Sequence, residues 1–481
     1  MDSDKLRSQK TLGARSYHVI WWAASVLAIG LVMVMPGRYL YFLHGMPRLQ
    51  FACPLLIAVA AAAWFWCAVS GRITRDWTSV LKRCWPVIAL TLFDLAFLVF
   101  AYLTRKANPL VVTLPPARWW ANYFLLTLSM PAALFLGIIN RSAGNRRIGI
   151  ALLIILGVAF VVATAEYLQL SGYHNVIGQW LLNFNTKTGR LYPLWQWVPP
   201  EPVRAQGLNS NPNCFAFIAA IGACWAIAAR GMRSLRMSVF LLSIGCILIS
   251  GTRSVLFSLL CVGVVFVIIQ IRAHTFRSWI RTHRSLLLIT IGGILLLFAA
   301  FAVAGGGVFP GVSRSVDTVT TLATESEATT SSAQASADVT SGRIVRWKHA
   351  LTSIIHHPLG TGQPYPLTTK QAHAHNDILN RLMTGGPLSA LLYCAVLFWF
   401  LFCLATPEAP RFGLYIGVFM LVTGLIDSLF VNYPFIQPVL FIAGVLASKE
   451  WLMGKVAFTR GGRREQRANI RTDGIKGEND G

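Results

Sequence analysis

Two arginines stand in segments that could bind an anionic group. Arg204 comes shortly before Asn211-Pro212, a pair typical of the first residues of a helix. Arg253 lies in Ser250-Gly251-Thr252-Arg253-Ser254, a short polar segment between two apolar stretches. A guanidinium binds phosphate through two parallel hydrogen bonds, and a nearby helix N-terminus supplies further N–H donors. Both arginines are therefore candidates for phosphate binding. The alternative is that each only anchors the chain at an interface.

A histidine-containing segment, His373-Ala374-His375-Asn376-Asp377, could transfer a proton. The apolar residues after it are spaced as on a short helix, with His375 at or just before the helix start. The positive end of a helix disfavours imidazolium, and a general base must be neutral to accept a proton. His375 is therefore the candidate base. One alternative is a surface histidine without a role. The other is a metal site, in which His373, His375 and Asp377 share one face of an extended segment. Because catalytic metal sites usually collect ligands from several segments, we predict no metal.

Three acidic residues lie within long apolar stretches: Asp94, Glu166 and Asp427. An ionisable group inside a membrane segment is costly, and each is therefore a functional candidate by default. Asp427 falls near the outer end of its stretch, where it could line the same cavity as the two arginines. The sequence shows no evident basic partner for Asp94 or Glu166. It leaves their role open between a neutral, helix-bonded state and a proton path.

The elements that must position these residues are membrane helices. Of the 481 residues, 55% are hydrophobic and 12% are charged, whereas a soluble domain has about 25% charged residues. This composition excludes a soluble enzyme, and apolar runs long enough to span a bilayer recur along the chain. We predict an all-α polytopic membrane protein with about twelve transmembrane helices. They fall near residues 17–35, 49–70, 84–103, 119–139, 148–170, 212–229, 234–250, 254–271, 285–304, 386–404, 411–431 and 434–453.

The distribution of basic residues predicts the orientation of these helices. With the N-terminus in the cytoplasm, 27 of the 42 lysines and arginines lie on the inner side and 15 on the outer side. This asymmetry is the one that cytoplasmic loops of membrane proteins show. An even number of spans returns the C-terminus to the cytoplasm and leaves Arg204, Arg253 and His375 outside. The formal net charge of +24 is therefore mainly a topology signal and does not predict a nucleic-acid partner.

The predicted helices divide the chain into four parts. The first part, 1–304, contains helices one to nine and an outer loop near 171–211. The second is a large outer loop at 305–385. Helices ten to twelve lie within 386–453, and a basic cytoplasmic tail follows at 454–481.

The large outer loop has two recognisable segments. Residues 317–341 are rich in Ser, Thr and Ala, which is typical of a mobile low-complexity insertion. From Arg343 onward, apolar residues recur at helical spacing until Pro358. We predict an amphipathic helix at the outer membrane–water boundary, with Arg343 and Arg346 away from its apolar face.

Taken in order, these motifs resemble those of the O-antigen ligase and polymerase superfamily of bacterial membrane glycosyltransferases. Arg204-Ala-Gln-Gly-Leu208 is similar to the Arg-x-x-x-Leu motif of the ligases, and Ser250-Gly-Thr-Arg253-Ser to their Ser/Gly-x-Arg turn between two spans. His375-Asn376, followed after nine residues by Gly386-x-x-Ser389, is similar to a His-Asn and Gly-x-x-Gly pattern. Ser389 stands where the ligases usually carry glycine.

The segment before that histidine adds to the resemblance, because Gly342-Arg343 through Trp347 and Pro358-Leu-Gly-Thr-Gly362 are similar to the family's pattern. The architecture of the whole chain, with about twelve spans and one long outer loop late in the sequence, also fits.

The resemblance implies a periplasmic active site, an undecaprenyl-pyrophosphate-linked glycan as donor, and neither a metal nor another cofactor. Arg204 and Arg253 would then bind the donor pyrophosphate and stabilise it as it leaves. His375 would take the proton of the acceptor hydroxyl, and a single displacement would invert the anomeric carbon. Asn376, His373, Arg343 and Asp427 are the supporting candidates.

The acceptor stays open at this point. A ligase uses lipid A-core, a polymerase uses a second lipid-linked glycan, and a related group uses a hydroxyl of pilin or another protein. The Arg204 and His375 motifs favour the ligase. A different class is a transporter for an anionic lipid or a small anion, which would carry charged groups on both sides and at mid-depth. The candidate residues gather at one face, and this favours the transferase.

Overall fold

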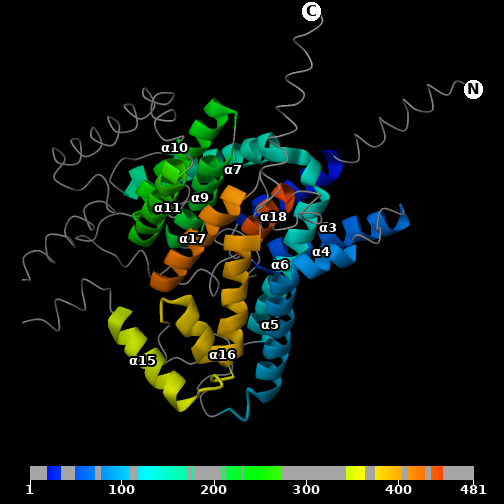
Figure 1. Cartoon of the computed structure of the whole chain (residues 1–481), viewed down its shortest axis with the longest axis vertical. Coiled ribbons are helices and arrows are strands. Elements are labelled where there is room, and N and C mark those ends of the chain that lie inside the picture. The colour runs from blue at the N-terminus through cyan, green and yellow to red at the C-terminus, as the bar shows by residue number, and fades with distance from the viewer. Residues whose placement is uncertain are drawn as a thin grey trace, which may run out of the picture.

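Helices make up all the regular structure of the part of the chain that can be described. A computed structural model describes residues 19–33, 49–70, 77–108, 117–170, 176–177, 205, 209, 212–229, 231–272, 343–362, 374–403, 410–427 and 435–447. Within these ranges there is no strand (Figure 1). The helices are Val19–Met33, α3 (Leu49–Val69), α4 (Trp77–Arg83), α5 (Trp85–Thr104), α6 (Ala117–Ile139), η1 (Arg141–Ala143), α7 (Gly144–Leu170), α9 (Pro212–Ala228), α10 (Arg233–Ser250), α11 (Arg253–Arg272), α15 (Arg343–His356), α16 (Asp377–Phe398), η4 (Trp399–Cys403), α17 (Pro410–Ile426) and α18 (Ile436–Leu446).

The apolar helices identify the chain as a membrane protein. Six of them are long and apolar enough to cross a bilayer, and they overlap α3, α5, α7, α10, α11 and α16. Five other predicted spans coincide with shorter apolar helices: Val19–Met33, Tyr123–Ile139, Pro212–Ala228, Arg411–Ile426 and Ile436–Leu446. The predicted span at 285–304, the insertion at 317–341 and the tail at 454–481 lie outside the described residues.

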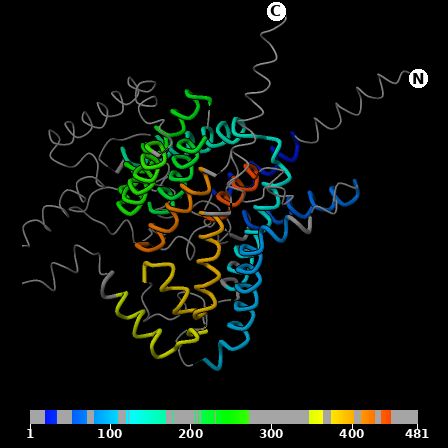
Figure 2. Tube along the Cα trace, viewed as in Figure 1, coloured from blue at the N-terminus to red at the C-terminus, as the bar shows by residue number. Residues whose placement is uncertain are grey.

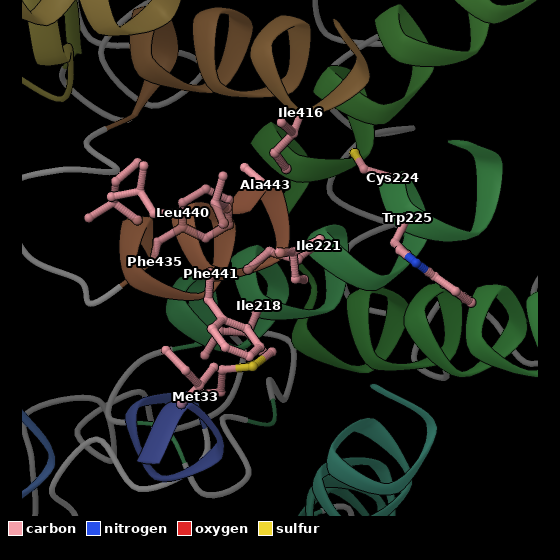
Figure 3. Packing of buried hydrophobic residues seen from close by; sticks show 14 of the residues in the cluster. Met33, Ile218, Ile221, Cys224, Trp225, Ile416, Phe435, Leu440, Phe441 and Ala443 are labelled. Carbon is pink, nitrogen blue, oxygen red and sulfur yellow. The ribbon is translucent and has the colours of Figure 1, made fainter. Parts of the chain in front are cut away.

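Helix α9 lies inside the bundle, and almost every side chain along it is buried. A helix that is apolar on all sides is typical of a buried position. It packs against α10, α7, α11 and α17. Figure 3 shows part of this core, in which Ile218 and Ile221 of α9 lie in one cluster with Met33 and with Phe441 of α18. The first turn of α9 is thereby fixed by packing on several sides.

Helix α16 is broken near its middle. Gly386 has φ 70° and ψ −168°, and Pro387 follows it, so Asp377–Gly385 forms a short helix before the longer apolar one. Because proline has no N–H, the carbonyl of Met383 loses its helical partner. The chain after α15 supplies a replacement: the N–H of Thr361 donates to the carbonyl of Met383 at 2.8 Å. This contact holds the end of α15 against the break in α16.

Two glycines permit this close approach. Gly360 has φ 90° and lies against the backbone of 384–386, where an added Cβ would come within 2.5 Å of the nitrogen of Gly386. A Cβ at Gly386 would come within 2.5 Å of the carbonyl oxygen of Leu359. Both positions therefore require glycine for their backbone angle and for space. In Figure 2, α15 and the first part of α16 lie side by side, as their packing requires.

The first part of α16 is also tied to α5 by a buried ion pair. Arg381 donates to Asp94 at 2.6 Å, and both side chains are nearly buried, at 14% and 13% exposed. Asp94, for which the sequence showed no evident partner, thus has one that lies 287 residues away in the chain. Glu166 is buried in α7.

Candidate functional site

His375 occupies a strained position immediately before α16. Its φ is 47°, in the left-handed region that side chains other than glycine rarely adopt. Such an outlier persists only where the surroundings fix it, and it is a common feature of functional sites. Asn376 caps the helix, because its side-chain oxygen accepts from the N–H of Leu379 at 2.9 Å. The other end of the same amide donates to the carbonyl of Leu425 at 2.9 Å, which joins the start of α16 to the end of α17.

The imidazole of His375 lies between an acid and a guanidinium. Its Nδ1 is 3.3 Å from Oδ1 of Asp427, and its Nε2 is 2.6 Å from a terminal nitrogen of Arg346. A carboxylate only accepts hydrogen bonds and a guanidinium only donates them. The two contacts are satisfied together when Nδ1 carries the hydrogen and Nε2 carries the lone pair. In that tautomer the lone pair of Nε2 faces Arg346 and the ring is oriented by Asp427.

Asp427 connects the histidine to two further helices. It is 2% exposed and lies at the end of α17. Its Oδ2 accepts from the amide of Asn213 at 3.2 Å and from the hydroxyl of Ser254 at 3.4 Å. Asn213 belongs to the first turn of α9, and Ser254 to the first turn of α11. A buried carboxylate needs such donors, and here they also fix the direction of the oxygen that faces His375.

Arg253 lies at the edge of this site. Gly251, with φ 63°, ends α10 in the left-handed conformation, and α11 begins at Arg253. The hydroxyl of Thr252 donates to the side-chain oxygen of Asn213 at 3.2 Å, so both neighbours of Arg253 in the chain contact the Asn213–Asp427 pair. Arg253 itself is half-buried.

Arg204 lies outside the described residues, but the residue after it does not. Ala205 is fully buried, and its N–H donates to the carbonyl of Ile249 at 3.1 Å. Ile249 is in the last turn of α10, beside the turn that leads to Arg253. The backbone that follows Arg204 therefore lies next to the Arg253 turn, although the two are far apart in sequence.

The remaining supporting candidates are described only in part. His373 lies outside the described residues, and Arg343 is described as the first residue of α15 but without its side chain. Asp377 is fully buried and accepts from the hydroxyl of Tyr393 at 3.1 Å. Among the described residues, no group of three or more His, Cys, Asp or Glu side chains lies close enough to hold a metal ion.

Sequence reasoning missed the importance of two residues at this site. Arg346 was assigned only to the polar side of the amphipathic helix. Its signal was its position one turn after Arg343, because residues three apart share a helix face. Asn213 was read only as part of a helix start. Its signal was its place in the first turn of a wholly apolar helix that directly follows the Arg204 segment.

Comparison with known proteins supports the resemblance found in the sequence. The O-antigen ligase family model matches residues 238–394, about a third of the chain. The matched part includes Arg253, Arg346 and His375, whereas Asn213 and Asp427 lie outside it. No curated protein matches the chain. The match confirms the relationship to the O-antigen ligase and polymerase superfamily, and it indicates a membrane glycosyltransferase of that type acting on lipid-linked glycans.

Proposed function

We propose that the protein is an O-antigen ligase-like glycosyltransferase that transfers a glycan from an undecaprenyl-pyrophosphate donor to an acceptor hydroxyl. The observation that carries the proposal is the buried Asp427 against Nδ1 of His375, in a site bordered by the turn that leads to Arg253. This is the arrangement that a general base needs, because the carboxylate orients the ring and stabilises the imidazolium that forms.

The reaction is a single displacement at the anomeric carbon. Nε2 of His375 takes the proton of the acceptor hydroxyl as the oxygen forms its bond to that carbon. The bond between the anomeric carbon and the pyrophosphate oxygen breaks, and its electron pair leaves with the pyrophosphate. Arg204 and Arg253 stabilise the charge that develops on this leaving group. The configuration at the carbon is inverted, and no residue becomes covalently modified.

The site belongs at the periplasmic face of the bacterial inner membrane. The positive-inside distribution of lysine and arginine supports this orientation, with both termini in the cytoplasm. The donor is a lipid whose pyrophosphate lies at headgroup depth, so its reactive end can meet the ends of membrane helices. The starts of α9, α11 and α16 and the end of α17 meet at the site.

The acceptor is the finer part of the proposal, and the Arg204 and His375 motifs favour lipid A-core. A second lipid-linked glycan, as in a polymerase, and a hydroxyl of pilin or another protein are the alternatives. Purified protein in nanodiscs should be given one lipid-linked glycan donor with each of the three acceptors in turn. Transfer to lipid A-core identifies a ligase, extension of the lipid-linked glycan a polymerase, and labelled pilin a protein glycosyltransferase.

The same assay tests the class of the protein. A transferase forms a new glycosidic bond in vitro, and NMR of the product gives the inverted configuration at the linkage. A chelator should leave the rate unchanged, because His375 and not a metal activates the hydroxyl. A transporter for an anionic lipid would move the donor across the bilayer and give no product. That result with all three acceptors would contradict the proposal.

A further inference from the structure

Both ring nitrogens of His375 have a partner within the protein. Asp427 accepts from Nδ1, and Arg346 donates to Nε2 at 2.6 Å. The lone pair of Nε2 is the one that must receive the acceptor proton. While Arg346 holds that lone pair, an acceptor hydroxyl cannot bind there. The cation beside the ring also opposes the positive charge that the ring must take up. His375 is therefore blocked as a base in this state.

The charge of Arg346 is not balanced by an acid within the described residues. Its hydrogen-bond partner among those residues is the imidazole of His375, and no carboxylate in that part of the chain forms an ion pair with its guanidinium. A half-buried guanidinium with a neutral partner is well suited to bind an anion. Its planar fork matches the oxygens of a phosphate better than it matches one ring nitrogen.

The packing of α15 leaves this arginine able to turn. The helix is held against α16 by its other residues, since Ala350, Trp347 and Ile354 form an apolar cluster with Ala374 and Met383. Arg346 lies in the first turn of α15 and does not belong to that cluster. Its side chain can therefore change rotamer without unpacking the helix, and such flips are fast in partly exposed side chains.

We propose that Arg346 couples donor binding to release of the base. This inference rests on the proposed function, because the anion it invokes is the pyrophosphate of the lipid-linked donor. When that group enters, Arg346 leaves Nε2 for a pyrophosphate oxygen and exposes the lone pair of His375. The contact that blocks the histidine is thus exchanged for a contact that binds the donor. An ordered reaction follows, in which the donor binds first and the acceptor hydroxyl second.

The exchange has a thermodynamic consequence that can be measured without turnover. Donor binding must break the contact between Arg346 and His375, so part of its binding free energy is spent on that step. Removal of His375 removes this cost and leaves Arg346 free to bind the anion. A variant that cannot catalyse transfer should therefore bind the donor lipid more tightly than the wild type does.

The experiment measures the affinity of undecaprenyl pyrophosphate without a glycan for the full-length protein in nanodiscs. The variants are His375→Ala, Arg346→Gln and the double variant. His375→Gly is a second variant without the imidazole, and it avoids backbone strain because glycine accepts φ 47°. Lys348→Gln is the matched control for charge, since Lys348 is exposed on the same helix. A native gel or size-exclusion profile of each nanodisc preparation establishes that the variant is folded.

We expect His375→Ala and His375→Gly to bind the lipid about two- to tenfold more tightly than the wild type. Arg346→Gln should bind it about tenfold more weakly or worse, and the double variant should match Arg346→Gln. Lys348→Gln should stay within about twofold of the wild type. The inference is overturned if loss of His375 leaves the affinity for the lipid unchanged or lowers it. It is also overturned if loss of His375 still raises this affinity when Arg346 has been replaced.

These outcomes are separate from the fate of the proposed function. If neither the wild type nor any variant binds undecaprenyl pyrophosphate, the proposed donor is wrong and the inference is lost with it. If binding is retained but the gain on removing His375 is absent, the donor stands and the coupling through Arg346 is rejected.

Discussion

Arg346 contacts His375 just before the short first part of α16, Arg381 belongs to that part, and the two guanidiniums are held in opposite ways. Arg381 is nearly buried and forms an ion pair with Asp94 at 2.6 Å. Arg346 is half-buried and contacts a neutral imidazole. A buried guanidinium with a matched carboxylate is fixed, because any movement leaves two charges without a partner. A partly exposed guanidinium on a neutral partner is free to exchange that partner for an anion. The difference separates a structural side of α16, toward α5, from a chemical side, toward α15 and α17.

The largest expected effect tests whether the α15 side is the chemical one. Loss of a general base typically costs about 10²–10⁴-fold in rate, so His375→Ala should lower kcat for glycan transfer by that amount. The protein should still insert in the membrane and unfold at the same temperature. His349→Ala is the control, because His349 is exposed on α15. Transfer by His375→Ala at a rate close to that of the wild type would remove this histidine from the mechanism.

The next effect concerns the structural side. Asp94→Asn removes the carboxylate that pairs directly with the buried Arg381, which should cost about 3–5 kcal/mol of unfolding free energy. Replacement of both partners, as Asp94→Leu with Arg381→Met, should recover most of that loss because no charge remains to be desolvated. Arg346→Gln should change the same free energy by less than about 0.5 kcal/mol. Unfolding in detergent, followed by circular dichroism, gives all three values.

Two results would contradict this comparison between the two arginines. If the Asp94→Asn variant is as stable as the wild type, the ion pair does not hold α5 to α16. If Arg346→Gln is as destabilising as Asp94→Asn, then Arg346 is also structural, and the division of α16 into two sides is wrong.

The sequence predicted the local features of this molecule well. Apolar runs located eleven helices, and six of these are long enough to span a membrane. The spacing of the apolar residues after His375 placed a helix start next to it, because this periodicity is a local property of the sequence. The order of the motifs led to the correct superfamily for residues 238–394.

The contacts that define the site could not be predicted in the same way. Asp94 and Arg381 are 287 residues apart in the chain, and Asp427 and His375 are 52 apart. Hydropathy shows that each lies in or near a helix, but it carries no information on which helices are neighbours. The choice between Arg343 and Arg346 as the partner of His375 depends on the rotation of α15, which is set by its apolar contacts with Ala374 and Met383.

A smaller effect tests the break in α16 at Gly386, where the backbone after α15 packs against it. Gly386→Ala forces a side chain into φ 70° and against the carbonyl of Leu359. A strained backbone of this kind costs about 1–3 kcal/mol, and thermal unfolding should show it. Gly157→Ala is the control: Gly157 lies within α7, and an added Cβ there meets nothing within 4 Å. The control should be neutral or slightly stabilising, since alanine favours a helix over glycine. Equal stability of the two variants would show that the break in α16 does not depend on Gly386.

The smallest expected effect tests whether Asn213 helps to orient the carboxylate of Asp427 beside His375. Asn213 donates to Asp427 at 3.2 Å and accepts from Thr252, so it sets the direction of the carboxylate. Loss of one such hydrogen bond is worth about 1 kcal/mol, and Asn213→Ala should therefore slow transfer about fivefold. Ser254→Ala, which removes the longer bond of 3.4 Å, should slow it less. In the Asp427→Asn background, Asn213→Ala should have almost no further effect, because the carboxylate it orients is gone. If it slows that background as much as the wild type, Asn213 supports the start of α9 and does not act on the His375–Asp427 pair. The orientation of His375 would then depend on its contacts with Asp427 and Arg346 and not on Asn213.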